Sequence, residues 1–255
     1  MFKGRIFVCA DIHGDASVVR NIIKQIDNPT EEDTIIVCGD AGFEYQDYVM
    51  GQAKRAARKF PGVWVILRGN HDSCYWKEHA LKEVDSAIGG WKILRNNGDD
   101  FLYQNRFKNI LYVRDEGGIY KIGPYNFLML PGAYSIDKHY RLKNNLPWNP
   151  DEQLDLDTMS EILDIIYDWN KNGFPIDYVI GHSFPKYLEP YYKDLFISFI
   201  NQDNVDKTTE NWLDAMADVF ETNPDFKHYF GGHFHDDRAL THKYTMVYHE
   251  VIRIK

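Results

Sequence analysis

The chain has 255 residues, of which 44% are hydrophobic and 26% are charged, and its formal net charge is −9. This composition suits a folded protein with a large core, and we expect residues 1–255 to form one domain. The acidic balance argues against extended duplex nucleic acid as the main partner, because such binding depends on many basic contacts to phosphates.

The cysteines and the N-terminus indicate a cellular location. Only Cys9, Cys38 and Cys74 occur, and their separations resemble neither a zinc ribbon nor a redox pair. The N-terminus enters an expected strand at once, without a signal-peptide pattern. No apolar stretch approaches the ~20 residues needed to cross a bilayer. We therefore expect a reduced, cytoplasmic protein with no contact to a membrane.

The first third of the chain alternates between strand and helix patterns. Short apolar runs at residues 5–10, 34–38 and 63–67 predict strands covered on both faces. Between them, a helix is expected from about Ser17 to the stop at Asn28-Pro29, and another over residues 46–59. This alternation predicts crossover connections and a largely parallel sheet.

Further elements are expected along the rest of the chain. In order, the patterns predict strands at 109–113, 118–122 and 125–130, a helix at 151–172, a strand at 178–180, a helix at 209–222, a strand at 228–230 and a closing hairpin around 242–244. The polar segment 131–141 leaves the third of these strands and is expected to be a loop.

Five predicted strands end in segments that carry metal-ligand chemistry, and half of the ten histidines lie in them. The segments are Asp11-Ile12-His13-Gly14, Gly39-Asp40, Gly69-Asn70-His71-Asp72, Gly181-His182 and Gly232-His233-Phe234-His235. Ligands of open α/β sheets bind beyond the carboxyl ends of the strands, so one fold brings these segments together. Carboxylate and imidazole suit Mn, Fe, Ni or Zn, and the set suffices for two ions. A structural zinc site closes with four ligands, usually including Cys.

Taken singly, some of these segments have a simpler structural explanation. Asp11 fits a cap for the helix at Ser17, and Gly39-Asp40 is a common pair between a strand and a turn. A single histidine after a strand, such as His182, is usually a polar residue with a satisfied hydrogen bond. These alternatives explain each segment separately, but not the ordered set.

Two segments are more specific. Turn chemistry explains the Gly and Asn of the third segment, but not His71 followed by Asp72. In the last segment, alternation along an extended chain would put the imidazoles of His233 and His235 on one face. The set as a whole therefore favours a metal centre.

The five ordered motifs, Asp-x-His, Gly-Asp, Gly-Asn-His-Asp, Gly-His and Gly-His-x-His, resemble those of the calcineurin-like metallophosphoesterase superfamily. They span most of the chain, from Asp11 to His235. The resemblance implies an α/β fold: a four-layer αββα sandwich of two mixed β-sheets flanked by helices. It also implies a dinuclear hydrolase that acts on a phosphate ester by in-line attack of a metal-bound hydroxide.

The resemblance assigns roles to the motif residues. It implies a first ion held by Asp11, His13 and His235, and a second held by Asn70, His182 and His233. Asp40 would bridge both ions, for which its two carboxylate oxygens suit it. His71 would stay free of metal and protonate the leaving group, a role typically worth about 10²–10⁴ in rate. We expect the two ions to be divalent transition metals, with Mn favoured over Fe, Ni or Zn.

One position departs from the family pattern. Many members continue the second motif as Gly-Asp-x-x-Asp, and that second Asp orients the catalytic histidine, but here the position is Phe43. This departure disfavours the Ser/Thr protein phosphatase subgroup and favours bacterial or phage-type members. Glu44, Asp72 or a backbone carbonyl remain as candidates to orient His71. We favour Asp72, although adjacent side chains on an extended chain point apart.

Two further residues are candidates for substrate binding. Arg141, together with His139, would reach over the metals to contact phosphate, because the planar donors of Arg grip phosphate oxygens in pairs. The alternative is that the segment that carries them is simply an exposed loop.

The expected activity is that of a phosphatase or a phosphodiesterase. The diesterase alternative covers nucleotides and nucleic-acid ends, and the motifs do not separate the two, because they build the reaction centre while the loops set specificity. A catalytically silent, metal-bound regulatory module is disfavoured, because no ligand and no acid of the motif set is missing.

Overall fold

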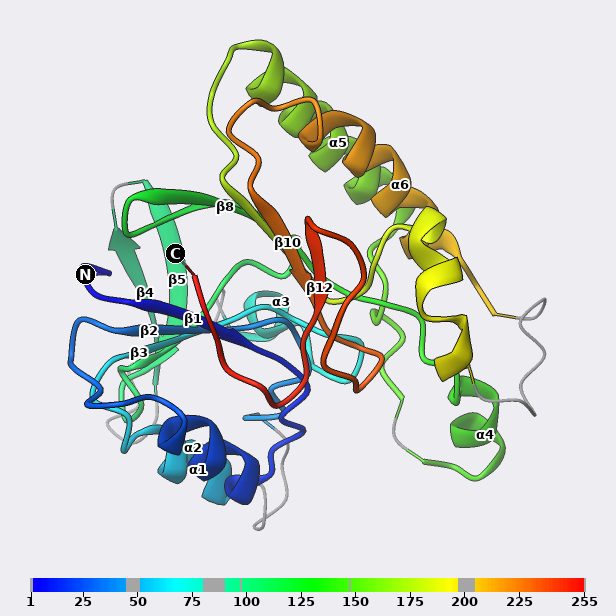
Figure 1. Ribbon diagram of the computed structural model, residues 1–255. Helices are drawn as coiled ribbons and strands as arrows, with labels where there is room; N and C mark the ends of the chain where they lie inside the picture. Colours follow the sequence, from blue (N-terminus) through cyan, green and yellow to red (C-terminus); the bar gives the residue numbers. More distant parts are fainter. Residues whose placement is uncertain are drawn as a thin grey trace.

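The computed structural model describes residues 2–44, 51–79, 90–96, 98–146, 148–196 and 205–254. Two β-sheets lie between two layers of helices (Figure 1). The first sheet contains β1 (Ile6–Cys9), β2 (Thr34–Val37), β3 (Val63–Ile66), β4 (Trp91–Asn96), β5 (Asp99–Gln104), β6 (Ile110–Tyr112) and β13 (Ile252–Arg253). The second contains β7 (Gly118–Ile122), β8 (Tyr125–Leu130), β9 (Tyr178–Gly181), β10 (His228–Gly231), β11 (Arg238–Ala239) and β12 (Tyr244–Met246).

Both sheets are mixed. In the first, the order is β13-β1-β2-β3-β6-β5-β4, and β1, β2, β3 and β6 run parallel. In the second, the order is β11-β12-β10-β9-β8-β7, with β12, β10, β9 and β8 parallel. The strands at or near the edges pair antiparallel, namely β13, β5 and β4 in the first sheet and β7 and β11 in the second.

Helices cover the outer face of each sheet. In Figure 1, α1 (Ala16–Lys24) and α2 (Gly51–Ala57) lie below the first sheet, and α5 (Leu156–Lys171) and α6 (Thr208–Phe220) lie together above the second. The shorter helices are α3 (Tyr75–His79), α4 (Lys138–Lys143) and the 3₁₀ segments η1 (Lys186–Tyr191) and η2 (Lys193–Leu195). No helix within the described ranges is long and apolar enough to cross a membrane.

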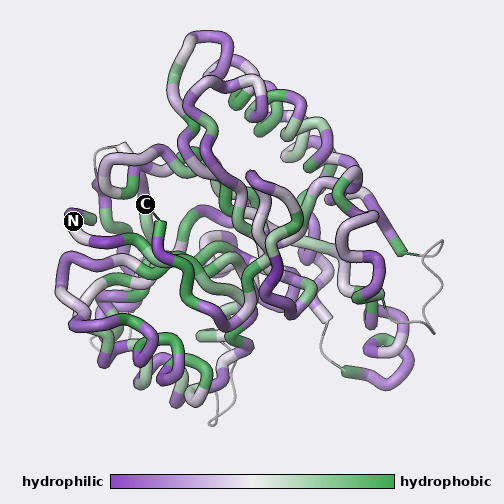
Figure 2. The backbone as a smooth tube through the Cα atoms, in the orientation of Figure 1, coloured by the Kyte–Doolittle hydropathy of each residue, from purple (hydrophilic) through white to green (hydrophobic). Residues whose placement is uncertain are grey.

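The core consists of three apolar layers. On β1, Phe7 and Cys9 pack against residues of the outer helices, whereas Ile6 and Val8 pack between the two sheets. Strands buried on both faces need consecutive apolar residues, which is the pattern in the sequence. The hydrophobic colour accordingly follows the central strands in Figure 2. A third cluster joins the second sheet to α5 and α6, for example through Ile166. The predicted αββα sandwich is therefore confirmed.

Several predicted boundaries need correction. α1 begins at Ala16 and its cap is Asp15, whose side chain accepts from the Ser17 N–H, so Asp11 is not a helix cap. The helix expected from residue 151 begins at Leu156, because Asp155 caps it by accepting from Thr158. Part of the helix expected at 46–59 lies outside the described residues, and α2 accounts for the described part.

The C-terminal hairpin is confirmed as β11 and β12, but the strands β4, β5 and β13 and the short helices α3 and α4 were missed. The hairpin of β4 and β5 is only partly buried and mixes charged with apolar residues, so its pattern is weak. β13 has two residues, and it is defined only by its pairing with β1.

Candidate metal centre

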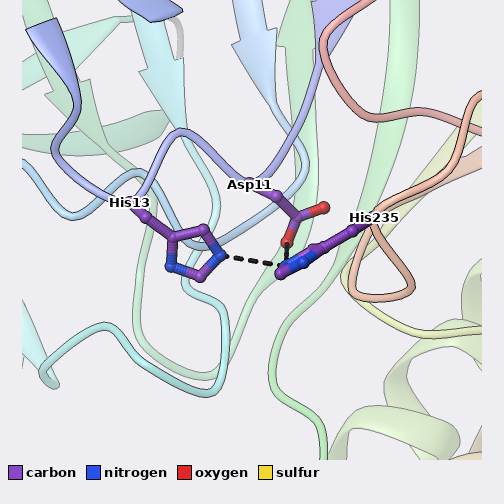
Figure 3. A group of neighbouring side chains, drawn as sticks. All are labelled: Asp11, His13 and His235. Atoms are coloured by element: carbon purple, nitrogen blue, oxygen red, sulfur yellow. Dashed lines mark hydrogen bonds and ion pairs between the residues drawn. The ribbon is translucent and has the colours of Figure 1, made fainter. Parts of the chain in front are cut away.

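The first group of expected ligands comes together at the ends of β1 and β10. The Nε2 atoms of His13 and His235 lie 3.0 Å apart, and the Asp11 Oδ1 lies 3.7 Å from the His235 Nε2 (Figure 3). This Asp11 oxygen is buried and has no hydrogen-bond partner. A buried, unpaired carboxylate oxygen is costly, and a cation would satisfy it. The residues present therefore fit a divalent ion.

The second group lies at the ends of β3, β9 and β10. The Asn70 Oδ1 is 2.7 Å from the His182 Nε2 and 3.2 Å from the His233 Nδ1. The Asn70 amide nitrogen donates to the Ser135 Oγ at 2.8 Å, which turns the amide oxygen toward the two imidazoles. An amide oxygen and two ring nitrogens thus converge on one point, as ligands of one ion would.

Asp40 lies between the two groups. Its Oδ2 is 3.5 Å from the His182 Nε2 and 3.9 Å from the His13 Nε2, so it faces one imidazole of each group. Asp11, Asp40 and His182 also form a candidate ligand cluster of their own, in which all three residues are buried. This position is the one that a bridging carboxylate needs.

Three of the four imidazoles, those of His13, His233 and His235, are favoured in the neutral form that binds metal. Burial lowers the pKa of His13 to about 4, and it also lowers the pKa values of His233 and His235. For His182, burial alone would lower the pKa, but the charge of Asp40 outweighs it and raises the pKa to about 9. The His182 Nδ1–H donates to the Cys38 carbonyl at 2.8 Å, which leaves Nε2 facing the ligand groups.

The backbone is strained at the same positions. Five of the eight non-glycine residues with positive φ in the described chain are expected ligands: Asp11 (51°), His13 (48°), Asp40 (51°), His233 (75°) and His235 (53°). Such conformations are uncommon for non-glycine residues and cluster at functional sites. The expectation of an extended chain through 233–235 was therefore wrong. The two imidazoles of this segment belong to separate ligand groups.

Close packing explains two of the motif glycines. A Cβ on Gly39 would lie 2.2 Å from the His182 Nδ1, and a Cβ on Gly69 would lie 2.1 Å from the Asp40 Oδ1. Both positions must lack a side chain so that loops from different strands can approach one another.

The sequence profile of the calcineurin-like phosphoesterase family matches residues 4–237. The chain belongs to this family. No curated protein matches the sequence. Among solved structures, the phosphopantetheinyl hydrolase of Mycobacterium tuberculosis is 12% identical, with a TM-score of 0.46, over 97% of this chain and 89% of that one. The cold-active protein-tyrosine phosphatase of a psychrophilic Shewanella is 14% identical, with a TM-score of 0.33, over 96% and 71%.

In this phosphoesterase, the expected acid His71 borders the same cleft as the ligands. Its backbone N–H donates to the Asp40 Oδ1 at 2.9 Å, and its ring centre lies 5.5 Å from that of His13. Among the described residues, its ring belongs to neither candidate ligand cluster. His71 is therefore placed beside the metal centre with its ring open to the cleft.

Asp72, which was expected to orient His71, is directed elsewhere in the phosphoesterase. Its fully buried carboxylate accepts from the backbone N–H groups of Ala41, Gly42 and Gly69 and from the Tyr75 hydroxyl. The side chains of His71 and Asp72 point apart, as is usual for adjacent residues of an extended chain. Asp72 thus ties the loop after β2 to the loop after β3.

Glu44, the other candidate, also has different partners. Its carboxylate pairs with the Lys54 amine and accepts from the Tyr112 hydroxyl and the Gln104 amide. Phe43, at the departing position, is 1% exposed and packs against Trp64. The missing aspartate has thus been replaced by a core residue, and neither neighbouring carboxylate contacts His71.

The centre opens into a cleft of about 1390 Å³. Arg141 borders it from α4, where its Nε donates to the Asp137 carboxylate at 2.7 Å. His139, on the same helix, is exposed and does not border the cleft. Of the two residues expected to contact phosphate, Arg141 borders the cleft and His139 does not, and their segment is partly helical rather than a loop.

Two supporting residues were not found from the sequence. Ser135 orients Asn70, and the Asn149 side chain donates to the Asp72 carbonyl at 2.8 Å. Ser135 lies in the polar segment singled out above, whereas nothing in the pattern marked Asn149. Both were missed because their role depends only on contacts between distant parts of the chain.

Proposed function

We propose that this phosphoester hydrolase is dinuclear, with Asp40 as the bridging ligand. The observation that carries the proposal is the position of its carboxylate between Asp11, His13 and His235 on one side and Asn70, His182 and His233 on the other. Two bound divalent ions would supply Lewis acidity and lower the pKa of water for an in-line displacement at phosphorus.

The side chains of the protein supply the remaining chemistry. We assign to His71 the role of general acid, which donates a proton to the leaving oxygen, because its ring faces the cleft and is free of the ligand groups. Arg141 is assigned to bind the phosphate oxygens. Mn is our proposed metal, since the ligands combine carboxylate, amide and imidazole without thiolate.

The charges around the cleft favour a small organic phosphate over nucleic acid. Among the described residues, four acidic side chains outside the metal centre border the cleft, compared with two basic ones, Arg141 and Lys207. The acidic ones are Glu44, Glu78, Asp137 and Glu210. A phosphodiesterase acting on nucleotides remains the second candidate, because the cleft exceeds the ~300–1,000 Å³ of typical ligand pockets. All three cysteines are unpaired, which supports a cytoplasmic location.

A panel of phosphate esters tests the function. The purified protein, stripped and reloaded with Mn, Ni, Zn or Mg, is assayed on 4-nitrophenyl phosphate and bis(4-nitrophenyl) phosphate. We expect turnover of at least one ester that requires added metal and is abolished by Asp40→Asn. Metal analysis that gives one ion per chain in a fully active enzyme would overturn the dinuclear proposal.

A further inference from the structure

The loop between β12 and β13 contacts the first ligand group through two stacked rings. The Tyr248 ring is stacked on the His235 ring, with centres 5.1 Å apart and an angle of 14° between the planes. The His249 ring is stacked in turn on Tyr248, at 3.6 Å and 19°. His235 thus lies next to two stacked rings, Tyr248 and His249, which lie outside the five ligand motifs.

The same loop also supports Asp11. The His249 Nε2–H donates to the Asp11 carbonyl at 3.2 Å, and the Tyr248 carbonyl accepts from the Ala10 N–H at 2.9 Å. Asp11 has positive φ, so its peptide needs outside contacts to stay in this conformation. One loop therefore holds two of the three residues expected to bind the first ion.

The loop is itself fixed to the fold. The Tyr248 N–H donates to the Asp237 carboxylate at 2.7 Å, and the Gln25 side chain of the α1 C-cap donates to the His249 carbonyl at 2.9 Å. The Val247 N–H donates to the Gly231 carbonyl at 2.8 Å. These contacts reach α1, the end of β10 and the segment after His235, so the two rings have a rigid base.

We propose that Tyr248 and His249 are positioning residues for the first metal ion, acting through His235 and Asp11. The inference rests on the proposed two-metal function. The side chain of His235 is 48% exposed, in contrast to the fully buried His182 of the second group. An exposed imidazole loses rotamer freedom when it binds an ion, and the stack removes that freedom in advance.

Metal binding by matched variants tests the proposal. Mn²⁺ is titrated into the stripped, full-length protein, and bound ions are counted by elemental analysis after equilibrium dialysis. Tyr248→Leu removes the stacking ring and should weaken binding of one of the two ions by about 10–100-fold, while the other ion binds as before. Tyr248→Phe keeps the ring and should bind both ions normally. Tyr167→Leu, at an exposed position of α5, is the control for losing a tyrosine.

A second pair of variants covers the case in which Tyr248→Leu does not fold. His249→Leu removes the ring and the hydrogen bond to the Asp11 carbonyl, and it should weaken the same ion. His249→Gln retains a donor and should restore part of the affinity. Wild-type affinity for both ions in folded Tyr248→Leu and His249→Leu would overturn the inference. A wild-type protein that binds one ion would instead refute the dinuclear function.

Discussion

At the scale of single residues, the pKa values of two neighbouring buried aspartates, Asp40 and Asp72, are shifted in opposite directions. Burial alone would raise the pKa of Asp40, but the charge and hydrogen bond of His182 outweigh it and hold the pKa well below the usual range. For Asp72, burial raises the pKa, and the nearby charge of Asp40 adds to it. Asp40 therefore stays ionised, as a ligand of a cation must, whereas the Asp72 carboxylate accepts hydrogen bonds from backbone N–H groups.

The first prediction concerns Asp40. Asp40→Asn should reduce the metal content from about two ions to fewer than one, because one carboxylate serves both ligand groups. Elemental analysis of the purified variant, compared with wild type at equal Mn²⁺, measures this. Two ions bound with unchanged affinity would show that Asp40 is not the bridge.

The second prediction concerns His71. His71→Asn should keep both ions but lower kcat by about 10²–10⁴ on phenyl phosphate, which has a poor leaving group. The loss should be smaller on 4-nitrophenyl phosphate, whose leaving group needs little protonation. If the variant instead loses a metal ion, or if both esters slow equally, His71 is not the acid.

At the scale of elements, loops from neighbouring strands are joined by buried charges. Asp72 links the loops after β2 and β3, and Asp33 links the starts of β1 and β2. The Asp33 carboxylate accepts from the Arg5 backbone and guanidinium and from the Thr30 N–H. These two aspartates fix the parallel strands at opposite ends, and the ligand loops depend on that register.

The third prediction follows from the hydrogen bonds of Asp72. Asp72→Asn replaces an acceptor of three backbone N–H groups by a group with one fewer acceptor oxygen, so it should lower metal content and thermal stability together. Asp164→Asn, at an exposed position of α5, is the matched control. An Asp72→Asn enzyme with full metal content and an altered pH profile would support direct action on His71 instead.

The fourth prediction concerns Asp33 and pH. Burial alone would raise the pKa of Asp33, but hydrogen bonds from Arg5 and Thr30 hold it at about 2. A lowered folded-state pKa adds stability above the unfolded value of about 4, and this contribution disappears as pH falls toward 2. Asp33→Asn should therefore lower the free energy of unfolding by about 1 kcal/mol at pH 7 and by less near pH 2. Urea unfolding of the metal-free protein at several pH values checks this, and an equal loss at both pH values would contradict it.

At the scale of the whole molecule, the metal centre connects the two sheets. The loops after β1, β2 and β3 come from the first sheet, and those after β9 and β10 come from the second. Their ligands meet at one end of the sandwich, so bound ions would hold both sheets together there.

The fifth prediction concerns metal removal. Ions that bind only the folded protein stabilise it by about 2.7 kcal/mol when their concentration is 100 times the Kd. Chelation should therefore lower the Tm by several degrees, and Mn²⁺ should restore it. Calorimetry of the chelated and reloaded protein measures the shift, with Asp40→Asn as the control that should not respond. An unchanged Tm after complete metal removal would contradict the prediction.

The sequence by itself determined the strands that carry the ligands and the chemistry of those ligands. Consecutive apolar residues are required where a strand is buried on both faces, so residues 6–9, 34–37 and 63–66 were recognisable from local pattern alone. The ordered motifs after the strands indicated the family and the ligand set for the same reason: a metal centre needs particular donor atoms, whatever holds them.

Only the tertiary structure decided what supports these ligands. The partners of Asp72, the orientation of Asn70 by Ser135 and the stack of Tyr248 on His235 all join residues far apart in the chain or in different loops. No periodicity records such contacts, because they depend on how the loops meet rather than on how each strand or helix forms. The side chains of the adjacent residues His71 and Asp72 likewise lie in different surroundings: His71 borders the cleft, whereas the Asp72 carboxylate is buried.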